Sequence, residues 1–257
     1  MPRRLLGTSL PKSGTHLLAG IFAQLGFTTR AVRKAGLSEV VDVSVFNVDT
    51  PADLYLYGHL RERQADVLEA VQRQGYQVIV MVRDPRDVCL SMVDFLASGR
   101  PSHVHRSEPA LIRLSRHDLL QGVICGFDLP DYKTPPIRDL VMGWLEWRRH
   151  GGIVIRFEEI VEAVLAGISP PGLRHIDVDC EAFVAAAAAT FGDQAGKTFN
   201  RGLIRRWETE FEPRTMDLWQ AHALGVASYL GYAEVGEPVR HGSKAQASAA
   251  LSTDVGP

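Results

Sequence analysis

The chain reads LLGTSLPKSGT from Leu5 to Thr15, an apolar run that ends in a short turn of Pro, Lys, Ser and Gly. The apolar run predicts a strand, and the apolar residues after the turn recur at helical spacing, which predicts a helix from Thr15 to Gln24. In this arrangement the unpaired N–H groups at the helix start converge on one point, where Lys12 adds a full positive charge. The stretch therefore indicates a site for a phosphate or sulfate group.

The turn itself carries three more features that suit an anion. Gly14 allows the backbone to approach closely, and the hydroxyls of Ser13 and Thr15 can donate hydrogen bonds. A nucleotide kinase loop reads G-x-x-x-x-G-K-[ST], whereas here Pro11 precedes Lys12 and the glycine follows it. That difference weakens a kinase interpretation, and a turn of this composition between a strand and a helix is often only a turn.

A second stretch, residues 78–87, reads VIVMVRDPRD. Its continuous apolar run is typical of a buried parallel strand. Asp84 suits the N-cap of a following helix and Pro85 its first position, so we expect a helix from Pro85 to about Leu96.

Arg83 lies between that strand and that helix, at the carboxyl end of the strand, where open α/β sheets bind ligands. Ser91, on the expected helix, faces back toward Arg83 and can share an anion with it. Taken alone, Arg83 would be expected to be a surface arginine paired with Asp84 or Asp87.

The two stretches together resemble the signatures of sulfotransferases that use 3′-phosphoadenosine-5′-phosphosulfate (PAPS). In that family a Y-P-K-S-G-T-T-W-like loop holds the 5′-phosphosulfate and an R-[ND]-P-[RK]-D-V-x-x-S segment holds the 3′-phosphate. This chain reads LPKSGTHL at 10–17 and RDPRDVCLS at 83–91. A third segment, FNRGLIRRW at 199–207, resembles the family's late F-R-K-G-x-x-G-D-W segment. The resemblance covers roughly residues 4 to 232.

The resemblance implies that the chain binds PAPS and releases 3′-phosphoadenosine-5′-phosphate (PAP). The residues that it assigns to the cofactor are Lys12, Ser13, Gly14, Thr15, His16, Arg83, Ser91, Arg201 and Gly202. The chain departs from the family at Leu17, where a tryptophan commonly stacks on adenine, and at Asn200, which lacks the family's positive charge. Arg205 or Arg206 would supply that charge, and Trp207 could replace the missing aromatic contact.

The family also has a histidine base between the two anion loops, and in YLYGHL at 55–60 that place is taken by His59. Histidine as a residue type titrates near neutrality, so it can accept the proton of a hydroxyl group. Lys12 would neutralise the charge that grows on the bridging oxygen as the sulfuryl group leaves. We therefore expect His59 and Lys12 to be catalytic. Considered alone, His59 would be a structural histidine at a strand end.

Length and pattern predict the fold class. The 257 residues alternate strand and helix patterns, so we expect a single P-loop-like three-layer α/β domain with a central parallel sheet flanked by helices. We expect the domain to span 1–232, with acceptor-pocket loops at roughly 30–50 and 99–136 and a helical island inside the second. The tail at 233–257, rich in Gly, Ser and Ala, is expected to be disordered.

Composition limits the partners. The 28 basic and 30 acidic residues leave a net charge of −2, which argues against a nucleic-acid surface. Three cysteines without paired spacing indicate free thiols in a reducing compartment. We expect a cytoplasmic protein, because the chain has neither an apolar run long enough for a membrane span nor a secretory segment. His103 and His105 lack a third ligand nearby, so no metal is expected.

The sequence thus predicts a sulfotransferase that moves a sulfuryl group from PAPS to a hydroxyl, less readily an amine, of a small-molecule or glycoside acceptor. Two alternatives stay open: a P-loop nucleotide-dependent kinase and a non-catalytic relative that binds PAPS. The sequence does not identify the acceptor, and it leaves open a homo-oligomer.

Overall fold

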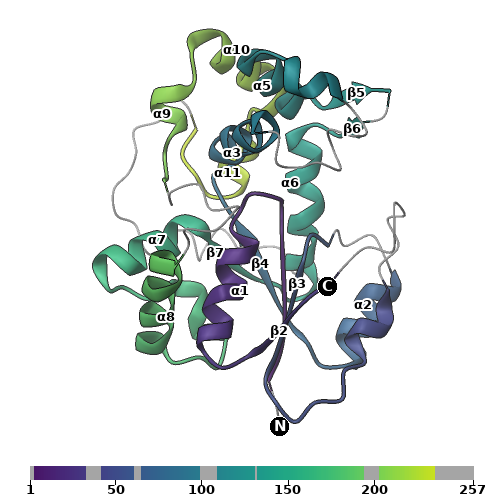
Figure 1. Ribbon diagram of the computed structural model, residues 1–257, viewed down its shortest axis with the longest axis vertical. Coiled ribbons are helices and arrows are strands. Elements are labelled where there is room, and N and C mark those ends of the chain that lie inside the picture. The colour runs from purple at the N-terminus through teal and green to yellow at the C-terminus, as the bar shows by residue number, and fades with distance from the viewer. Residues whose placement is uncertain are drawn as a thin grey trace, which may run out of the picture.

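The computed structural model describes residues 3–32, 42–60, 65–98, 109–130, 132–193 and 203–234. Five parallel strands form a central sheet in the order β2-β3-β1-β4-β7 (Figure 1). The strands are β1 (Arg4–Ser9), β2 (Thr28–Ala31), β3 (Leu54–Gly58), β4 (Gln77–Val82) and β7 (Ile153–Arg156). A separate antiparallel hairpin pairs β5 (Phe127–Leu129) with β6 (Tyr132–Thr134).

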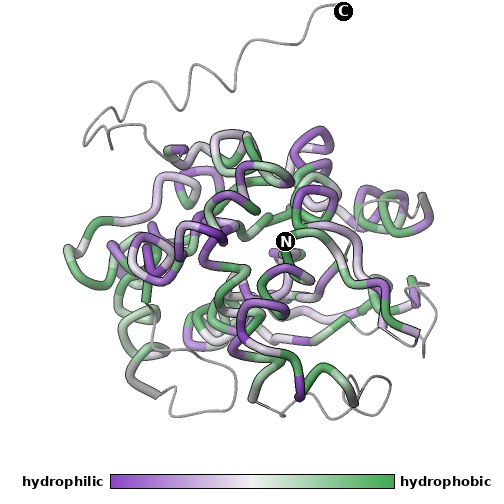
Figure 2. The backbone as a smooth tube through the Cα atoms, turned by 90° about the horizontal axis from the view of Figure 1, so that it is seen from above, coloured by the Kyte–Doolittle hydropathy of each residue, from purple (hydrophilic) through white to green (hydrophobic). Residues whose placement is uncertain are grey.

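Helices cover both faces of the sheet, because side chains alternate between the faces along each strand. Leu5 and Ile79 belong to the core under α1 (Thr15–Gln24), α7 (Phe157–Ala166) and α8 (Cys180–Asp193). Their neighbours Leu6 and Val80 belong to the core under α2 (Ala65–Arg73) and α6 (Ile137–Leu145). Figure 2 shows hydrophilic and hydrophobic residues alternating along the outer helices, as expected for helices with one buried face.

A third group of helices lies beyond the carboxyl ends of the strands, at the top of Figure 1. It consists of α3 (Pro85–Ala97), α5 (Arg116–Cys125), α9 (Trp207–Glu210), α10 (Pro213–Ala223) and α11 (Val226–Tyr229). Short 3₁₀ helices complete the described chain: η1 (Val43–Phe46), η2 (Pro109–Arg113), η3 (Glu146–His150) and η4 (Pro171–His175). This helical group covers the edge of the sheet where the sequence places the two anion-binding stretches.

The register of the sheet brings those stretches together. Ser9 at the end of β1 pairs with Met81 on β4, and Thr8 pairs with Gly58 at the end of β3. The turn that contains Lys12, the residue Arg83 and the residue His59 therefore follow three neighbouring strands at one edge of the sheet, which we call the carboxyl edge.

The expected α/β fold with a central parallel sheet is confirmed. The helix expected from Thr15 to Gln24 has those bounds, and the helix expected from Pro85 to about Leu96 ends at Ala97. The hairpin of β5 and β6, in the segment expected to be acceptor-pocket loops, was not anticipated. Most of the expected tail, from residue 235 onward, lies outside the described residues. None of the helices in the described part of the chain is long and apolar enough to cross a bilayer.

Candidate active site

The Lys12 turn, residues 10–15, links β1 to α1 through two residues with left-handed backbone. Lys12 has φ 72° and Gly14 has φ 98°, and the turn is closed by a hydrogen bond from the Ser13 N–H to the Leu10 carbonyl (3.2 Å). Gly14 is the N-cap of α1 and has no side chain to cap the helix, so the N–H groups of the first turn meet no side-chain cap. Successive residues in such conformations form a concave arrangement that binds anions. The geometry of the turn is therefore that of an anion site.

Gly14 is required for reasons that the sequence did not reveal. A Cβ atom on Gly14 would lie 2.6 Å from Met81 Cε and 2.8 Å from Phe157 Cδ2. The positive φ would also strain any residue with a side chain. The turn therefore packs on side chains of β4 and α7. This packing favours glycine at position 14, in addition to the close approach of an anion that the sequence suggested.

Two hydroxyls of the turn differ in their surroundings. Ser13 is buried, and its Oγ has no hydrogen-bond partner among the described residues. The hydroxyl of Thr15, also buried, is hydrogen-bonded to the Ser9 hydroxyl. The Ser13 hydroxyl thus has a donor to offer, whereas Thr15 can donate to an anion only when Ser9 donates to Thr15.

His16, the next residue, lies at the start of α1. Its ring meets that of Tyr57 edge to face, with 5.8 Å between the ring centroids. Desolvation, and then the charge of Lys12, lower the pKa of His16 below its ordinary value. The imidazole beside the turn is therefore neutral at physiological pH.

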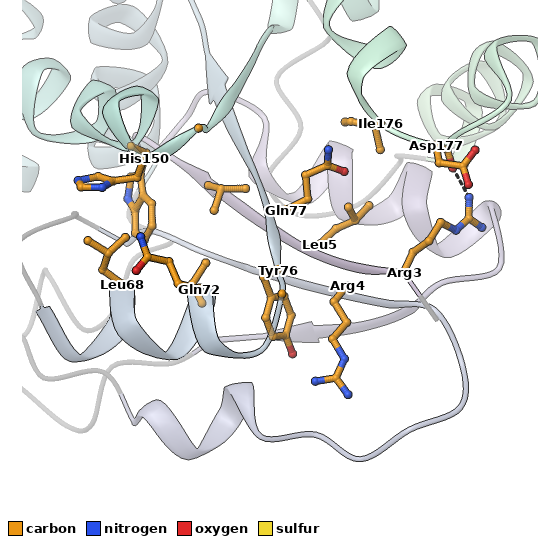
Figure 3. A pocket seen from close by; sticks show the side chains of 15 residues that line it. Arg3, Arg4, Leu5, Leu68, Gln72, Tyr76, Gln77, His150, Ile176 and Asp177 are labelled. Carbon is orange, nitrogen blue, oxygen red and sulfur yellow. Dashed lines mark hydrogen bonds between the residues drawn. The ribbon is translucent and has the colours of Figure 1, made fainter. Parts of the chain in front are cut away.

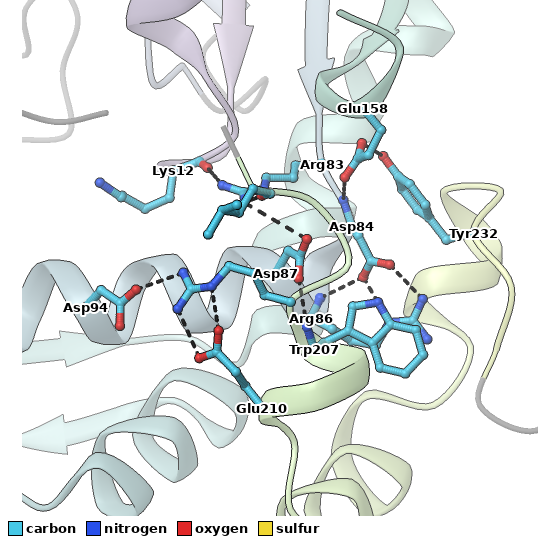
Figure 4. A network of polar contacts seen from close by, with 12 residues as sticks. Lys12, Arg83, Asp84, Arg86, Asp87, Asp94, Glu158, Trp207, Glu210 and Tyr232 are labelled. Carbon is cyan, nitrogen blue, oxygen red and sulfur yellow. Dashed lines mark hydrogen bonds and ion pairs between the residues drawn. The ribbon is translucent and has the colours of Figure 1, made fainter. Parts of the chain in front are cut away.

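Arg83 approaches the Lys12 turn from the end of β4 (Figure 4). Its Nη1 donates to the Lys12 carbonyl over 3.2 Å and its Nη2 donates to the Leu203 carbonyl over 2.8 Å. The side chain is only 5% exposed and stacks on Phe157, whose ring centroid lies 4.6 Å from the guanidinium carbon. The expectation for Arg83 taken alone, a surface arginine, is therefore wrong.

The two arginines of this stretch have different partners. Arg86 forms a bidentate pair with Asp84, at 2.9 Å from Nε and 2.7 Å from Nη2. Arg83 has only a loose ion pair with Asp87, at 4.0 Å, and its buried Nε has no hydrogen-bond partner within the described ranges. Arg86 is thus paired with a neighbouring carboxylate, although its buried Nη1 also has no hydrogen-bond partner within the described ranges. Arg83 differs in that its guanidinium contacts the Lys12 turn and its carboxylate partner is distant.

Burial shapes the charges around Arg83. It lowers the pKa of the Arg83 guanidinium, although Asp87 and Glu158 oppose that shift. It raises the pKa of Asp87, against the opposing effect of Arg83. Because the buried guanidinium and carboxylate face each other at 4.0 Å without a hydrogen bond, neither charge is fully compensated.

The first turn of α7 supports both anion-binding stretches. Phe157 packs under Gly14 and under the Arg83 guanidinium. Glu158 accepts hydrogen bonds from the Asp84 N–H (3.0 Å) and from the Tyr232 hydroxyl (2.6 Å). From the sequence alone, these two residues have no assigned role. No local pattern could have shown it, because the hydrogen-bond partners of Glu158 each lie 74 residues away and Phe157 packs under residues that are still more distant or equally so.

The segment from residue 203 to 234 covers Arg83 and its neighbours. The Trp207 N–H donates to Asp87 (3.0 Å), and the Ala233 carbonyl accepts from Arg86 (2.9 Å). The guanidinium carbon of Arg86 lies 3.6 Å from the centroid of the Trp207 ring, so Arg86 covers one face of that ring. Arg206 is held by Asp94 and Glu210, so its charge is already matched and the expectation that it replaces Asn200 is not supported.

His59 follows β3 on the other side of β1. Its Nδ1 lies 2.9 Å from the Ser9 carbonyl, which can only accept, so Nδ1 carries the proton. Nε2 is then the basic nitrogen of the neutral ring. The next residue, Leu60, is also fastened: its carbonyl accepts from Thr8 Oγ1 (2.8 Å) and from Trp147 Nε1 (3.0 Å). The backbone on both sides of His59 is thus tied to the end of β1.

The remaining expected site residues are placed as follows. Ser91 is buried on α3, and no hydrogen bond joins it to Arg83 among the described residues. Arg201 and Gly202 lie outside the described residues, as do His103 and His105. The structure therefore brings Lys12, Arg83 and His59 to one edge of the sheet, while residues 199–202 of the late segment lie outside the described residues.

A cavity of about 560 Å³ lies at the opposite edge, where the strands begin (Figure 3). Its polar lining is engaged within the protein: Arg4 donates to Gln74, Gln77 donates to the His175 carbonyl, and Arg3 pairs with Asp53. Parallel sheets bind their ligands at the carboxyl ends of the strands. The Lys12 and Arg83 region, rather than this cavity, is therefore the candidate site.

The comparisons with known proteins agree with the architecture. Neither a family model nor a curated protein sequence matches the chain. Among solved structures, the crystal structure of mouse sulfotransferase SULT7A1 complexed with PAP is similar, with a TM-score of 0.60 and 20% sequence identity. The similarity covers 89% of this chain and 87% of that one. The chain therefore shares the fold of a sulfotransferase over most of its length.

Proposed function

We propose that this protein is a PAPS-dependent sulfotransferase that transfers a sulfuryl group to a hydroxyl, or less readily an amine, of a small molecule or glycoside. The fold shared with a sulfotransferase that was solved with PAP supports this proposal. So do the two stretches that resemble the family's cofactor signatures, because they meet at one edge of the sheet.

The observation that carries the proposal is the contact between Arg83 and the Lys12 turn. A donor with a phosphate at one end and a phosphosulfate at the other needs two cationic sites within one molecule's length. Here Ser13 Oγ and Arg83 Nε are buried donors without acceptors among the described residues, and both residues border one small, mainly apolar pocket of about 10 Å³. Buried donors are normally satisfied, so these two donors are the ones that we expect an anion bound at the Lys12 turn to engage. We therefore assign Lys12, Ser13, Gly14, Thr15 and His16 to the phosphosulfate and Arg83 to the 3′-phosphate.

PAPS, when bound, supplies an activated sulfuryl group. The protein's part is then positioning and charge stabilisation, as in phosphoryl transfer. Lys12 and the N–H groups of the α1 first turn stabilise negative charge at the phosphosulfate. His59 accepts the proton of the acceptor hydroxyl at Nε2, since Nδ1 is bound to Ser9. The tie between His59 and the end of β1 fixes the base relative to the Lys12 turn.

Calorimetric titration tests the cofactor site directly. We expect PAP to bind in the absence of magnesium, and Arg83→Ala and Lys12→Ala each to weaken that binding. A kinase of the P-loop type would instead bind ATP with magnesium and ignore PAP. A protein that binds neither PAP nor PAPS would refute the proposal.

Turnover separates an enzyme from a non-catalytic relative. We expect transfer of ³⁵S from labelled PAPS to at least one member of a panel of phenols, alcohols and sugars. If the protein binds PAP and no acceptor panel or cell extract yields a labelled product, the non-catalytic alternative is favoured. A tight PAP complex together with a labelled product would establish the proposed reaction.

A further inference from the structure

The ammonium group of Lys12 lies over an aromatic ring of α3. Lys12 Nζ is 4.5 Å from the ring centroid of Phe95, and both side chains are half-buried. In Figure 4 the side chain of Lys12 extends away from its own carbonyl, which faces Arg83. The backbone carbonyl of Lys12 therefore contacts Arg83, whereas its ammonium group contacts Phe95 on α3.

The part of α3 that carries Phe95 is held in place by the contacts of its neighbours. The neighbouring Asp94 carboxylate binds Arg116 and Arg206, each at 2.8 Å. The Phe95 carbonyl accepts a hydrogen bond from Ser98 Oγ at 2.7 Å. A long lysine side chain is flexible by itself, so a contact with a fixed ring limits the positions that its ammonium group can take.

The choice of an aromatic ring has an electrostatic consequence. A carboxylate beside Lys12 would neutralise the ammonium charge and repel an incoming anion. The face of a phenyl ring attracts a cation through its quadrupole and carries no net charge. Phe95 can thus hold the lysine without itself neutralising the ammonium charge.

We propose that Phe95 is a positioning residue for Lys12 in sulfuryl transfer. Its ring keeps the ammonium group beside the anion-binding turn before the donor arrives. This inference rests on the proposed function, since it concerns the lysine assigned to the phosphosulfate.

Nuclear magnetic resonance can observe the contact without cofactor. Lysine occurs at only five positions, 12, 34, 133, 197 and 244, so reductive ¹³C-methylation gives a spectrum simple enough to assign with Lys12→Arg. A methylated amine over a phenyl ring experiences the ring current. We expect the Lys12 methyl signals to lie upfield of those of Lys133, whose side chain is exposed beside Asp128. The upfield shift should vanish in Phe95→Leu and persist in Phe95→Tyr.

Kinetics on unmethylated protein test the functional part. Loss of the ring should lower kcat/KM for PAPS about two- to fivefold, which corresponds to roughly 0.5–1 kcal/mol at 1.36 kcal/mol per tenfold. Phe95→Tyr should restore it. Phe211→Leu is the matched control, because Phe211 is a half-buried ring that packs on Trp219 at 6.3 Å. It should leave both the Lys12 signals and kcat/KM unchanged, whatever its effect on thermal stability.

The outcomes separate this inference from the proposed function. An unshifted Lys12 signal, or unchanged kinetics in Phe95→Leu, in a protein that binds PAP would overturn the role of Phe95 alone. A protein that binds no PAP would overturn the proposed function, and the role of Phe95 in transfer with it. A lost shift and slowed transfer, both restored by tyrosine, would establish the role.

Discussion

The guanidinium of Arg83 donates a hydrogen bond to the carbonyl of Lys12, although 71 residues separate them in the sequence. The contact joins the ends of two neighbouring strands, β4 and β1, at the carboxyl edge of the sheet. It also places the backbone of one anion-binding stretch within reach of the side chain of the other. The variants below ask which parts of this junction bind the donor, which perform the reaction and which only maintain the fold.

Arg83→Lys should weaken PAP binding about ten- to a hundredfold. Lysine keeps the positive charge that faces Asp87, so the buried carboxylate retains a counter-ion. It loses the planar set of donors that can serve the Lys12 carbonyl and an anion together, and hydrogen bonds to charged groups contribute about 1.5–3 kcal/mol. Calorimetric titration with PAP measures the loss.

The control is Arg4→Lys at the opposite edge of the sheet, where the arginine donates to Gln74. It should leave PAP affinity unchanged. Equal losses in the two variants would mean that Arg83 acts through general stability or net charge rather than by contact.

His59→Asn should lower kcat about 10²- to 10⁴-fold, the usual contribution of a general base. The asparagine amide can replace Nδ1 as the donor to the Ser9 carbonyl, but it has no basic nitrogen. PAP affinity should be unaltered, because the residues assigned to the cofactor follow β1 and β4 rather than β3. Initial rates with saturating PAPS measure the effect.

The asparagine variant separates the two roles considered for His59. A structural histidine at a strand end would be replaced by asparagine with little loss of rate. His222→Ala, on the exposed side of α10, should leave the rate unchanged.

Gly14→Ala should destabilise the protein by about 2–5 kcal/mol. The left-handed backbone adds roughly 1–2 kcal/mol of strain, and the contacts with Met81 and Phe157 below 3 Å add the cost of overpacking, about 1–3 kcal/mol. Urea unfolding measures the free energy of unfolding.

Gly75→Ala is a matched control, because Gly75 has φ 66° and a Cβ there meets nothing within 4 Å. It should show only the backbone strain. If both variants lost the same stability, the packing of β4 and α7 beneath the Lys12 turn would not matter.

In Glu158→Gln the free energy of unfolding should fall less as pH rises than it does in the parent protein. Burial raises the pKa of Glu158 above its ordinary value of 4.5, and the hydrogen bond from Tyr232 opposes that shift. Since the folded state binds this proton more tightly than the unfolded state, its contribution to stability is present below pH 4.5 and is lost as pH rises through the folded pKa. Glutamine removes this titration and can still accept from the Asp84 N–H and donate to Tyr232.

The comparison uses the difference in unfolding free energy between parent and variant, from about pH 4 to pH 8. That difference should shift in favour of the variant as pH rises, because only the parent loses the contribution of Glu158. The carboxyl groups of Asp87 and Glu159 also have raised pKa values, but they titrate in both proteins and so cancel in the difference. A difference that is constant across the range would show that Glu158 does not titrate in this way.

The local elements of this site follow from sequence. The bounds of α1 and the start of α3 at Pro85 were predictable, because apolar residues at helical spacing after the Lys12 turn and an Asp-Pro pair are helix signals. The meeting of Lys12 with Arg83 was expected from the rule that parallel strands share one ligand-binding edge, whereas the order of the strands was not predicted. These inferences need only periodicity, capping and the topology of open sheets.

The supporting contacts were not predictable. Phe157 and Glu158 touch the two anion-binding stretches because α7 packs beneath them, and Tyr232 reaches Glu158 from near the end of the described chain. Arg206 seemed a spare cation, yet Asp94 and Glu210 enclose it. Such pairings depend on how distant helices pack, which periodicity along one segment does not encode.

The left-handed backbone of Lys12 has a consequence for ligand association. For a residue with a side chain, this conformation costs roughly 1–2 kcal/mol of conformational free energy, which other interactions of the folded protein must offset. The hydrogen bond from Ser13 to Leu10 and the packing of the turn on Met81 and Phe157 hold this conformation, so an arriving anion need not order the turn. Encounter is then governed by diffusion and electrostatic attraction, and little conformational entropy is left to lose on binding.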